Sequence, residues 1–378
     1  MTGQDIDGGT PPILQGLRDQ SRVRGISPGI QGVLIGLLCC GAGGVLGQTV
    51  PADLVDIPLE DLFAANVVEP DQKSERRWHL SYRYTRSKFD EYRSGSDTLS
   101  YNDVLWNGPT EVRTDDNYPV VPTEIEQEVH SFLLGYEYSP RLFFRLAVPI
   151  IEQSTDHISI VPGYDEFNIS SDGVGDVVAL ADYELGRTVN STWRAIAGVS
   201  IPTGSIDEVG DTPRAPGDQQ LPYTMQIGSG TWDLPVGIVF DKYDQYVNWG
   251  AEARAVIRTG TNDRDYRLGH KFSAGGWIKW GDLGRFQPGI RVKYRWQGEI
   301  SGDDVSLLLP NPRFPYPAPV VDPTAFGGQQ IDVSVFADVD LSDDWSVYAE
   351  YSRPVWFNLN GPQSAENFHL TIGLSTTF

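Results

Sequence analysis

The sequence is poor in the residues that would support a disulfide framework, a thiolate metal site or a nucleic-acid surface. Its only cysteines are Cys39 and Cys40, both in the N-terminal region. Acidic residues outnumber basic ones by 51 to 29, and the formal net charge of −22 argues against a nucleic-acid partner. The sequence shows no His/Cys metal spacing, no Walker-type loop and no dinucleotide fingerprint. We therefore predict no cofactor, no bound metal and no nucleic-acid partner.

Long apolar runs are also missing, so the sequence predicts no membrane-spanning helix. One short apolar run, residues 30–38, is followed by small residues (CCGAGGVLGQ) that suit signal-peptidase cleavage. This pattern predicts a secretory signal peptide over residues 1–47, which would carry both cysteines away. Residues 48–76 are then expected to form a periplasmic N-terminal segment. Within it, residues 53–68 are interpreted either as a short amphipathic helix or as a tethered tail.

Aromatic residues, glycine and a regular alternation of polarity are what the sequence does contain. It has 10 Trp, 17 Tyr, 15 Phe and 40 Gly, a composition that favours β structure. Segments in which every second side chain is apolar recur along the whole chain, and each is typical of a strand with one apolar face. We predict twelve strands, at 78–84, 129–138, 142–148, 177–185, 193–201, 231–240, 247–258, 268–280, 286–296, 331–341, 345–351 and 367–378.

The connections between these strands alternate between short and long. The five short ones lie at 139–141, 187–191, 241–245, 281–285 and 342–344, and the six long ones at 87–125, 153–174, 203–222, 259–267, 298–329 and 353–366. An even number of strands with short turns at one end and long loops at the other is the layout of an outer-membrane barrel. Such a barrel satisfies every backbone hydrogen bond within itself and can therefore sit in lipid.

The alternative is a soluble β-sandwich, whose strands alternate in the same way. Aromatic residues at strand ends and the predicted signal peptide favour the membrane. The chain also ends on an amphipathic strand with Phe378 as its last residue. We predict that this strand pairs with the first strand and closes the sheet. A C-terminal strand of this kind resembles the signal read by the outer-membrane assembly machinery. The prediction is thus a 12-stranded antiparallel transmembrane β-barrel over residues 77–378, with both ends periplasmic.

Three motifs in the middle of the chain resemble a known family. They read GVGDVVALADYEL, RAIAGVSIPTGS and GSGTWDLPVGI, and the resemblance covers roughly residues 172–280. In this order they are similar to motifs of the outer-membrane proteins assigned to a meta-pathway of phenol degradation, a group of transporter-like barrels. The resemblance implies a barrel, and says little about the solute. A structural role in turns and at the barrel rim is the interpretation we favour for the matching residues, which are Gly173, Gly175, Asp176, Pro202, Thr203, Gly204, Gly228, Gly230 and Asp233.

The polar faces of the predicted strands would line the interior of the barrel. Basic side chains gather on the seventh to ninth strands, and we predict that they line the lumen: Arg254, Arg258, Lys271, Lys279, Arg291, Lys293 and Arg295. Acidic side chains on the fourth and tenth strands form a second lumen-lining group: Asp176, Asp182, Glu184, Asp332, Asp338 and Asp340. Opposed walls of this kind would set up a transverse field across an open lumen. The alternative is that the charges pair and fill the interior.

The prediction for function is a channel or transporter in the outer membrane of a Gram-negative cell. It would let small solutes pass passively, hydrophobic or aromatic compounds among them according to the family resemblance. The alternative is a non-conducting structural or surface-binding barrel that acts through its loops. An enzyme is not predicted, because the five histidines have no convincing serine partner. The expected partners are outer-membrane lipid, the assembly machinery through Phe378, and a small solute, and the oligomeric state stays open.

Overall fold

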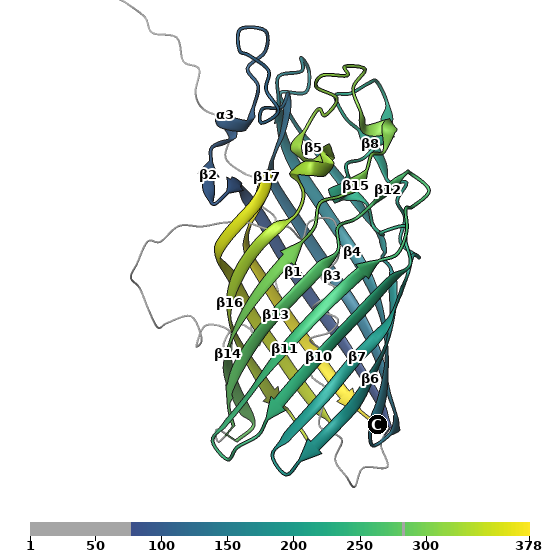
Figure 1. Ribbon diagram of the computed structural model, residues 1–378, viewed down its shortest axis with the longest axis vertical. Coiled ribbons are helices and arrows are strands. Elements are labelled where there is room, and N and C mark those ends of the chain that lie inside the picture. The colour runs from purple at the N-terminus through teal and green to yellow at the C-terminus, as the bar shows by residue number, and fades with distance from the viewer. Residues whose placement is uncertain (1–76, 282–283) are drawn as a thin grey trace, which may run out of the picture. The chain divides into compact units, whose positions relative to one another are not determined.

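The computed structural model describes residues 77–281 and 284–378, and nearly all regular structure in them is β (Figure 1). The predicted signal peptide, the periplasmic segment 48–76 and both cysteines lie outside the described residues. Each neighbouring pair of barrel strands is antiparallel, and neighbours in the sheet follow one another along the chain. The barrel strands are β1 (Trp78–Gly95), β3 (Val120–Ser139), β4 (Leu142–Ser159), β6 (Val177–Thr188), β7 (Ser191–Ile201), β10 (Asp233–Lys242), β11 (Val247–Arg258), β13 (Lys271–Trp280), β14 (Phe286–Gln297), β16 (Gly328–Asp340) and β17 (Trp345–Thr377).

The sheet closes where β17 pairs with β1, a junction that we call the seam. The register runs from His79 opposite Thr377 to Gly95 opposite Leu359. Beyond it, the backbone N–H and C=O of Trp78 bond those of Phe378 at 3.1 and 2.9 Å. The prediction that the last strand pairs with the first is confirmed, and with it the closed antiparallel barrel.

β17 has 33 residues, far more than any other strand of the described chain. Its residues up to Leu359 pair with β16, and those from Leu359 onward pair with β1. The two parts also touch each other, because the Arg353 guanidinium donates to the side chain of Asn367 at 3.0 Å. The ladder therefore continues through residues 353–366, which the sequence analysis had assigned to a loop.

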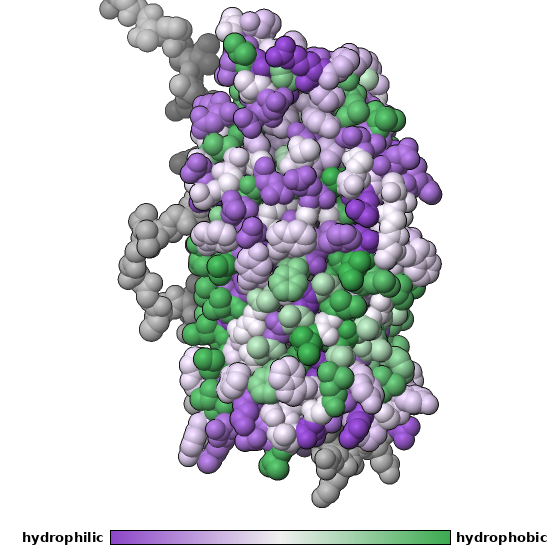
Figure 2. Space-filling model, viewed as in Figure 1, coloured by the Kyte–Doolittle hydropathy of each residue, from purple (hydrophilic) through white to green (hydrophobic). Residues whose placement is uncertain are grey.

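Polarity in the barrel is inverted relative to a soluble protein. Exposed positions carry large apolar side chains, among them Leu80, Phe132 and Leu146, and the alternate buried positions carry Arg83, Ser131 and Arg145. On the face shown in Figure 2, hydrophobic side chains gather in a band across the barrel, with mostly hydrophilic side chains above and below it. An apolar outer face and a polar interior are the arrangement expected of a barrel in lipid.

At the end with the long connections, several strands extend beyond the predicted limits. β4 continues to Ser159 and pairs with β5 (Glu166–Val174), within a connection that the sequence analysis had treated as a loop. The remaining short elements lie at this end of the barrel: β2 (Asp97–Leu99), α3 (Tyr101–Val104), β8 (Val209–Asp211), β9 (Asp218–Gln220), η2 (Tyr223–Met225), β12 (Tyr266–Arg267), β15 (Ser301–Gly302), η3 (Val305–Leu307), η4 (Pro319–Val321) and η5 (Pro323–Ala325). None of the helices in the described residues is both long and apolar enough to cross a membrane.

An outer face that lies in lipid should reject a charge. We expect Leu146→Arg, at a 40% exposed position on β4, to destabilise the barrel by about 2–4 kcal/mol, because an arginine would have to enter hydrocarbon. Val112→Arg is the control, since Val112 is 79% exposed in a connection rather than on the barrel wall, and little change is expected there. Guanidinium unfolding of the protein in lipid bilayers measures both. Equal effects at the two positions would contradict a lipid-facing wall.

Candidate functional site

Residues 203–232, which connect β7 to β10, fold back into the barrel, and we call them the inward segment. Ile227 packs against Val129 and Ile151, two buried residues on the inner face of β3 and β4. The Ser171 hydroxyl donates to the carbonyl of Met225 at 2.7 Å. Ile151 pairs with Gly173 of β5, just beyond the start of β6, so the inward segment meets the wall at the mouth of the barrel. It therefore narrows the space inside the barrel.

One buried carboxylate anchors the two ends of the inward segment. Asp176 lies between β5 and β6 and is 6% exposed. One of its oxygens accepts from the backbone N–H of Gly204 at 2.9 Å. The other accepts from the backbone N–H of Ser229 at 2.9 Å and from its hydroxyl at 2.6 Å. Hydrogen bonds to a charged acceptor are among the stronger ones in proteins, about 1.5–3 kcal/mol each.

Glycine allows the two ends of the inward segment to approach this closely. A Cβ on Gly228 would lie 2.4 Å from the carbonyl oxygen of Gly204, and one on Gly204 would lie 2.7 Å from the Cα of Gly228. Gly230 adopts φ +67°, which favours glycine. A Cβ on Gly173 would touch Ile227 at 3.4 Å. The motif residues found in the sequence, separated by up to 60 positions, thus converge on the anchor of one segment.

The anchor continues into the next strands through buried polar side chains. The Thr231 hydroxyl donates to Asp233 at 2.9 Å, and Asp233 also forms an ion pair with Arg258. Asp233 and Arg258 are 0% and 2% exposed. Asn262 donates to the carbonyl of Ser229 at 3.1 Å. A buried pair of this kind costs several kcal/mol if one partner is removed, because the other charge is left without compensation.

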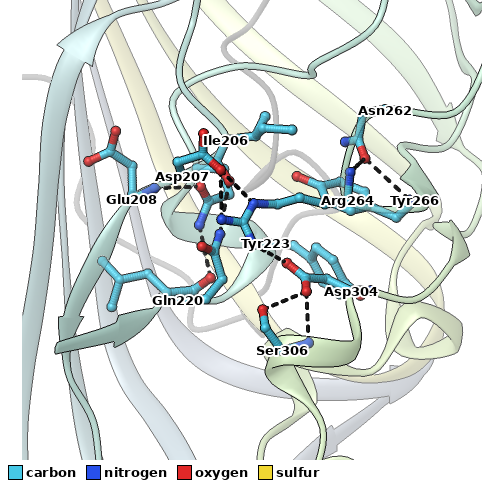
Figure 3. A network of polar contacts seen from close by, with 12 residues as sticks. Ile206, Asp207, Glu208, Gln220, Tyr223, Asn262, Arg264, Tyr266, Asp304 and Ser306 are labelled. Atoms are coloured by element: carbon cyan, nitrogen blue, oxygen red, sulfur yellow. Dashed lines mark hydrogen bonds and ion pairs between the residues drawn. The ribbon is translucent and has the colours of Figure 1, made fainter. Parts of the chain in front are cut away.

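A second network joins three of the long connections above the barrel (Figure 3). Arg264 donates from Nε to Asp207 at 2.8 Å and from Nη1 to Asp304 at 3.1 Å. The backbone N–H of Asp304 donates to the Tyr223 hydroxyl at 3.0 Å, and the Tyr223 ring meets Tyr266 edge-on at 4.8 Å. The connections therefore hold one another and the inward segment in place.

The charges in this second network are stabilised by their partners. Burial lowers the pKa of Arg264, but the hydrogen bond that Arg264 donates to Asp207 and the charge of Asp304 outweigh it and raise the pKa overall. Burial raises the pKa of Tyr223, so its hydroxyl stays protonated. Arg264 is therefore a fixed cation at physiological pH and Tyr223 a neutral hydrogen-bonding group.

Most of the charged residues that the sequence placed inside the barrel are buried and paired. Asp182 bonds Arg145 at 2.7 Å, and Arg254 bonds Glu252 at 2.7 Å. Arg291 bonds Glu350 at 2.8 Å and lies 5.1 Å from the centre of the Phe336 ring. The other predicted residues that are buried or half-buried are Arg258, Lys271, Lys279, Lys293, Arg295, Asp176, Glu184, Asp332 and Asp338.

Two features of the predicted charge pattern differ in the structure. Asp340 is exposed at the end of β16. The acidic side chains of β16 do not face the basic ones across the barrel, because β16 is the direct neighbour of β14. Arg295 bonds Asp332 at 2.6 Å, and Lys279 bonds Asp338 at 3.4 Å. The predicted field between two separated walls is replaced here by short ion pairs along the wall.

Sequence reasoning missed several charged residues that share this interior. Buried or half-buried charges absent from the predicted set include Arg83, Arg145, Arg194, Asp233, Asp241, Glu252, Glu350 and Glu366. For strand residues such as Arg83, Arg145 and Glu350, the same alternation of polarity would have identified them. An inner cluster of apolar side chains on β3 to β11 was not predicted either; it comprises Leu133, Ala147, Val178, Leu180, Ile196, Val239 and Val256.

The histidines considered for catalysis have other contacts. His130 Nδ1 bonds the Tyr82 hydroxyl at 2.7 Å, and His270 Nδ1 accepts from the backbone N–H of Arg258 at 3.0 Å. Within residues 77–281 and 284–378, no group of three or more His, Cys, Asp or Glu side chains is placed to hold a metal ion.

Comparisons with known proteins bear on the fold. No family model matches the chain, and no curated protein does. Among solved structures, the chain is similar to an outer membrane channel from Pseudomonas putida F1, with a TM-score of 0.52 and 15% identity over 80% of this chain and 96% of that one. At this identity, the likeness shows the fold alone, which is that of an outer-membrane β-barrel.

Two further likenesses are weaker. KdgM porin has a TM-score of 0.36 and 8% identity, covering 79% of this chain and 99% of its own. A Pseudomonas aeruginosa FadL homologue has a TM-score of 0.38 and 10% identity, covering 80% and 90%. Scores this low carry no argument about function.

The anchor can be tested by removing its charge. We expect Asp176→Asn to loosen the inward segment, because an amide replaces an acceptor of three hydrogen bonds and a loss of about 1–3 kcal/mol follows. Limited chymotrypsin digestion of the folded protein should then cut within residues 203–232 about tenfold faster. Asp172→Asn is the matched control, since Asp172 is exposed on the neighbouring β5. Unchanged digestion of the Asp176 variant would show that this carboxylate does not hold the segment.

Proposed function

We propose that the protein is an outer-membrane channel for the passive diffusion of small solutes, with the inward segment as its constriction. The observation that carries this proposal is the segment itself, anchored by Asp176 and seated against the inner face of β3 and β4. The inverted polarity of the barrel supports a place in lipid. The likeness in fold to the outer membrane channel from Pseudomonas putida F1 supports the same class of function.

The strand number and the orientation belong to this proposal. A closed sheet in which every neighbouring pair is antiparallel needs an even number of strands, and we count β17 as two strands that reverse near Leu359. The barrel then has 12 strands, as the sequence predicts. Residues 1–47 act as a Gram-negative secretory signal peptide, 48–76 as a periplasmic segment, and the strand ending in Phe378 as the part recognised by the assembly machinery. Both ends of the barrel domain are periplasmic.

The interior charges are proposed as the lining of the lumen. The set is that predicted from sequence, without Asp340 and with the addition of Arg145, Glu252 and Glu350. Ion pairs along the wall leave the lining polar without a strong net charge, which suits small polar solutes. The apolar cluster on β3 to β11 packs against itself, with members only 1–4% exposed, so it is part of the packed interior rather than a free surface. Passage of hydrophobic or aromatic compounds is proposed on the family resemblance. We propose no catalytic role.

The constriction makes a direct prediction for conductance. Ser205 and Ile227 are joined by a backbone hydrogen bond of 2.9 Å, so a short Gly-Ser linker can replace residues 206–226 without moving the anchor. We expect single-channel conductance in planar bilayers to rise severalfold, because the narrowing side chains are removed. Replacing the exposed residues 109–112 in the same way is the control and should leave conductance unchanged. Equal conductance of all three proteins would place the constriction elsewhere.

The lining makes a prediction for ion selectivity. We expect Arg291→Glu combined with Lys293→Glu to shift the reversal potential in a salt gradient toward cations, because two positive charges on the inner wall become negative. Arg285→Glu is the control, since Arg285 lies at the short turn before β14 with a side chain 66% exposed. A reversal potential that responds equally to both changes would argue that the wall of β14 does not line the ion path.

The second candidate is a non-conducting barrel that acts through its loops. It is favoured by the apolar core that the long connections form among themselves, which includes Tyr223, Leu307 and Val321. A barrel that is folded and inserted, yet silent in the conductance measurement both with and without the inward segment, would support this candidate instead.

A further inference from the structure

A cavity of about 320 Å³ lies among the long connections, beside the inward segment. Its wall comes from several parts of the chain that are distant in sequence. The end of β4 and the start of β5 contribute His157 and Phe167, the inward segment contributes Gln220, and the proline-rich stretch before η4 contributes Leu309. The volume falls within the range of small-molecule sites, about 300–1,000 Å³.

The chemistry of the wall is mostly apolar. Proline, valine, isoleucine and leucine side chains make up most of it. The His157 and Phe167 rings stack with centres 4.5 Å apart and planes 7° from parallel, which gives one side a flat surface. No carboxylate contributes to the wall. Aromatic rings bind well against surfaces of this kind.

Arg214 is the one cationic side chain among the described residues of the wall, and it is engaged with the protein, whereas burial lowers the pKa of His157 to about 4 and keeps it neutral. Arg214 donates from Nε to the Gln219 side chain at 3.2 Å and from Nη2 to the carbonyl of Gln220 at 2.6 Å. Burial also lowers the pKa of Arg214, which shows that its surroundings are unfavourable for charge. Because both acceptors of Arg214 are neutral, an anion is the competing kind of ligand, and the test below includes an anionic probe to separate the two.

One buried oxygen atom, Oε1 of Gln220, indicates that a ligand with a hydrogen-bond donor would be favoured. Gln220 is 7% exposed, and its Nε2 donates to the carbonyl of Ile206 at 2.9 Å. Its Oε1 is buried and accepts no hydrogen bond in the described part of the chain. A buried acceptor without a donor costs about 1–3 kcal/mol, and a ligand hydroxyl or amine would recover this.

We propose that this cavity binds a neutral, flat, mostly apolar molecule of about two rings that carries one hydrogen-bond donor. An apolar cavity of about 150 Å³ is known to hold one benzene ring, so twice that volume suits two rings. The donor bonds Gln220 Oε1, and the rings lie among the apolar side chains. Because Gln220 belongs to the inward segment, the ligand binds directly beside the constriction. Its role as a transported solute rests on the proposed channel function, whereas the binding itself does not.

The test compares three probes on the full protein in lipid nanodiscs, with empty nanodiscs subtracted, by equilibrium dialysis. The probes are 2-naphthol, naphthalene, which lacks the donor, and 2-naphthalenesulfonate, which is an anion. We expect saturable binding of 2-naphthol, about tenfold weaker binding of naphthalene, since one hydrogen bond is lost, and the weakest binding for the sulfonate. Absence of saturable 2-naphthol binding, or tighter binding of the sulfonate, would overturn the proposal.

A substitution of Gln220 tests whether this residue causes the preference for 2-naphthol over naphthalene. Gln220→Leu should reduce the tenfold preference for 2-naphthol over naphthalene to about onefold, and this ratio does not depend on the fraction of protein that is folded. Gln363→Leu is the matched control, because Gln363 is also buried and donates to a carbonyl, that of Gly327 at 2.8 Å, but lies outside the cavity wall. A preference that persists in the Gln220 variant would refute the assignment.

The binding result and the channel result are independent. A silent barrel that binds 2-naphthol would refute the channel and leave the cavity as a binding site. A conducting barrel without such binding would refute the cavity and leave the channel.

Discussion

The structure depends on the closure of one sheet. In lipid, a backbone N–H or C=O without a partner costs several kcal/mol, so an open edge is not tolerated. The seam between β1 and β17 removes both edges at once. With every backbone group paired inside the wall, side chains are free to follow two separate rules, apolar toward lipid and polar toward the interior. Everything inside the barrel, including the anchor at Asp176, relies on that polar interior.

A closed wall makes it possible to bury charge on a large scale. Pairs such as Arg145 with Asp182 and Arg291 with Glu350 connect neighbouring or nearby strands, so each holds the wall as well as neutralising its partner. The inward segment also buries a charge in the polar interior, but without an ion pair. Asp176 is stabilised by hydrogen bonds from backbone N–H groups and a hydroxyl of the segment rather than by an arginine. Its carboxylate therefore has all of these partners only when the segment is in place. The fold of the segment and the burial of this charge are therefore linked.

Alternation of polarity was sufficient to predict the barrel, because each strand has an apolar outer face and a polar inner face. It was insufficient at the end of the barrel with the long connections, where β4 continues to Ser159 and β5 begins at Glu166. There the outer face of β5 is polar, with Glu166, Asn168 and Ser170 exposed, whereas Phe167 and Ile169 face inward against Leu221 and Met225. The outward apolar face that marks a wall strand is therefore lost although the ladder continues. The partners of Asp176 were also beyond reach, because Gly204 and Ser229 are 28 and 53 residues away in sequence. The motifs identified such positions as special, but only the three-dimensional structure brings them together.

The seam also constrains the order in which the strands pair during folding. Every other barrel junction joins strands that follow one another along the chain, whereas the bond between the Ser81 and Ser375 hydroxyls spans 294 residues. The entropy of closing a loop grows with its length, and contacts of long sequence separation form slowly. Hairpins can therefore assemble one after another while the first strand still waits for its partner. A partly assembled barrel exposes the unpaired edge of β1 until β17 pairs with it, and an unpaired strand edge is a site for aggregation. The pairing of β17 with β1 therefore ends the period in which the barrel is vulnerable.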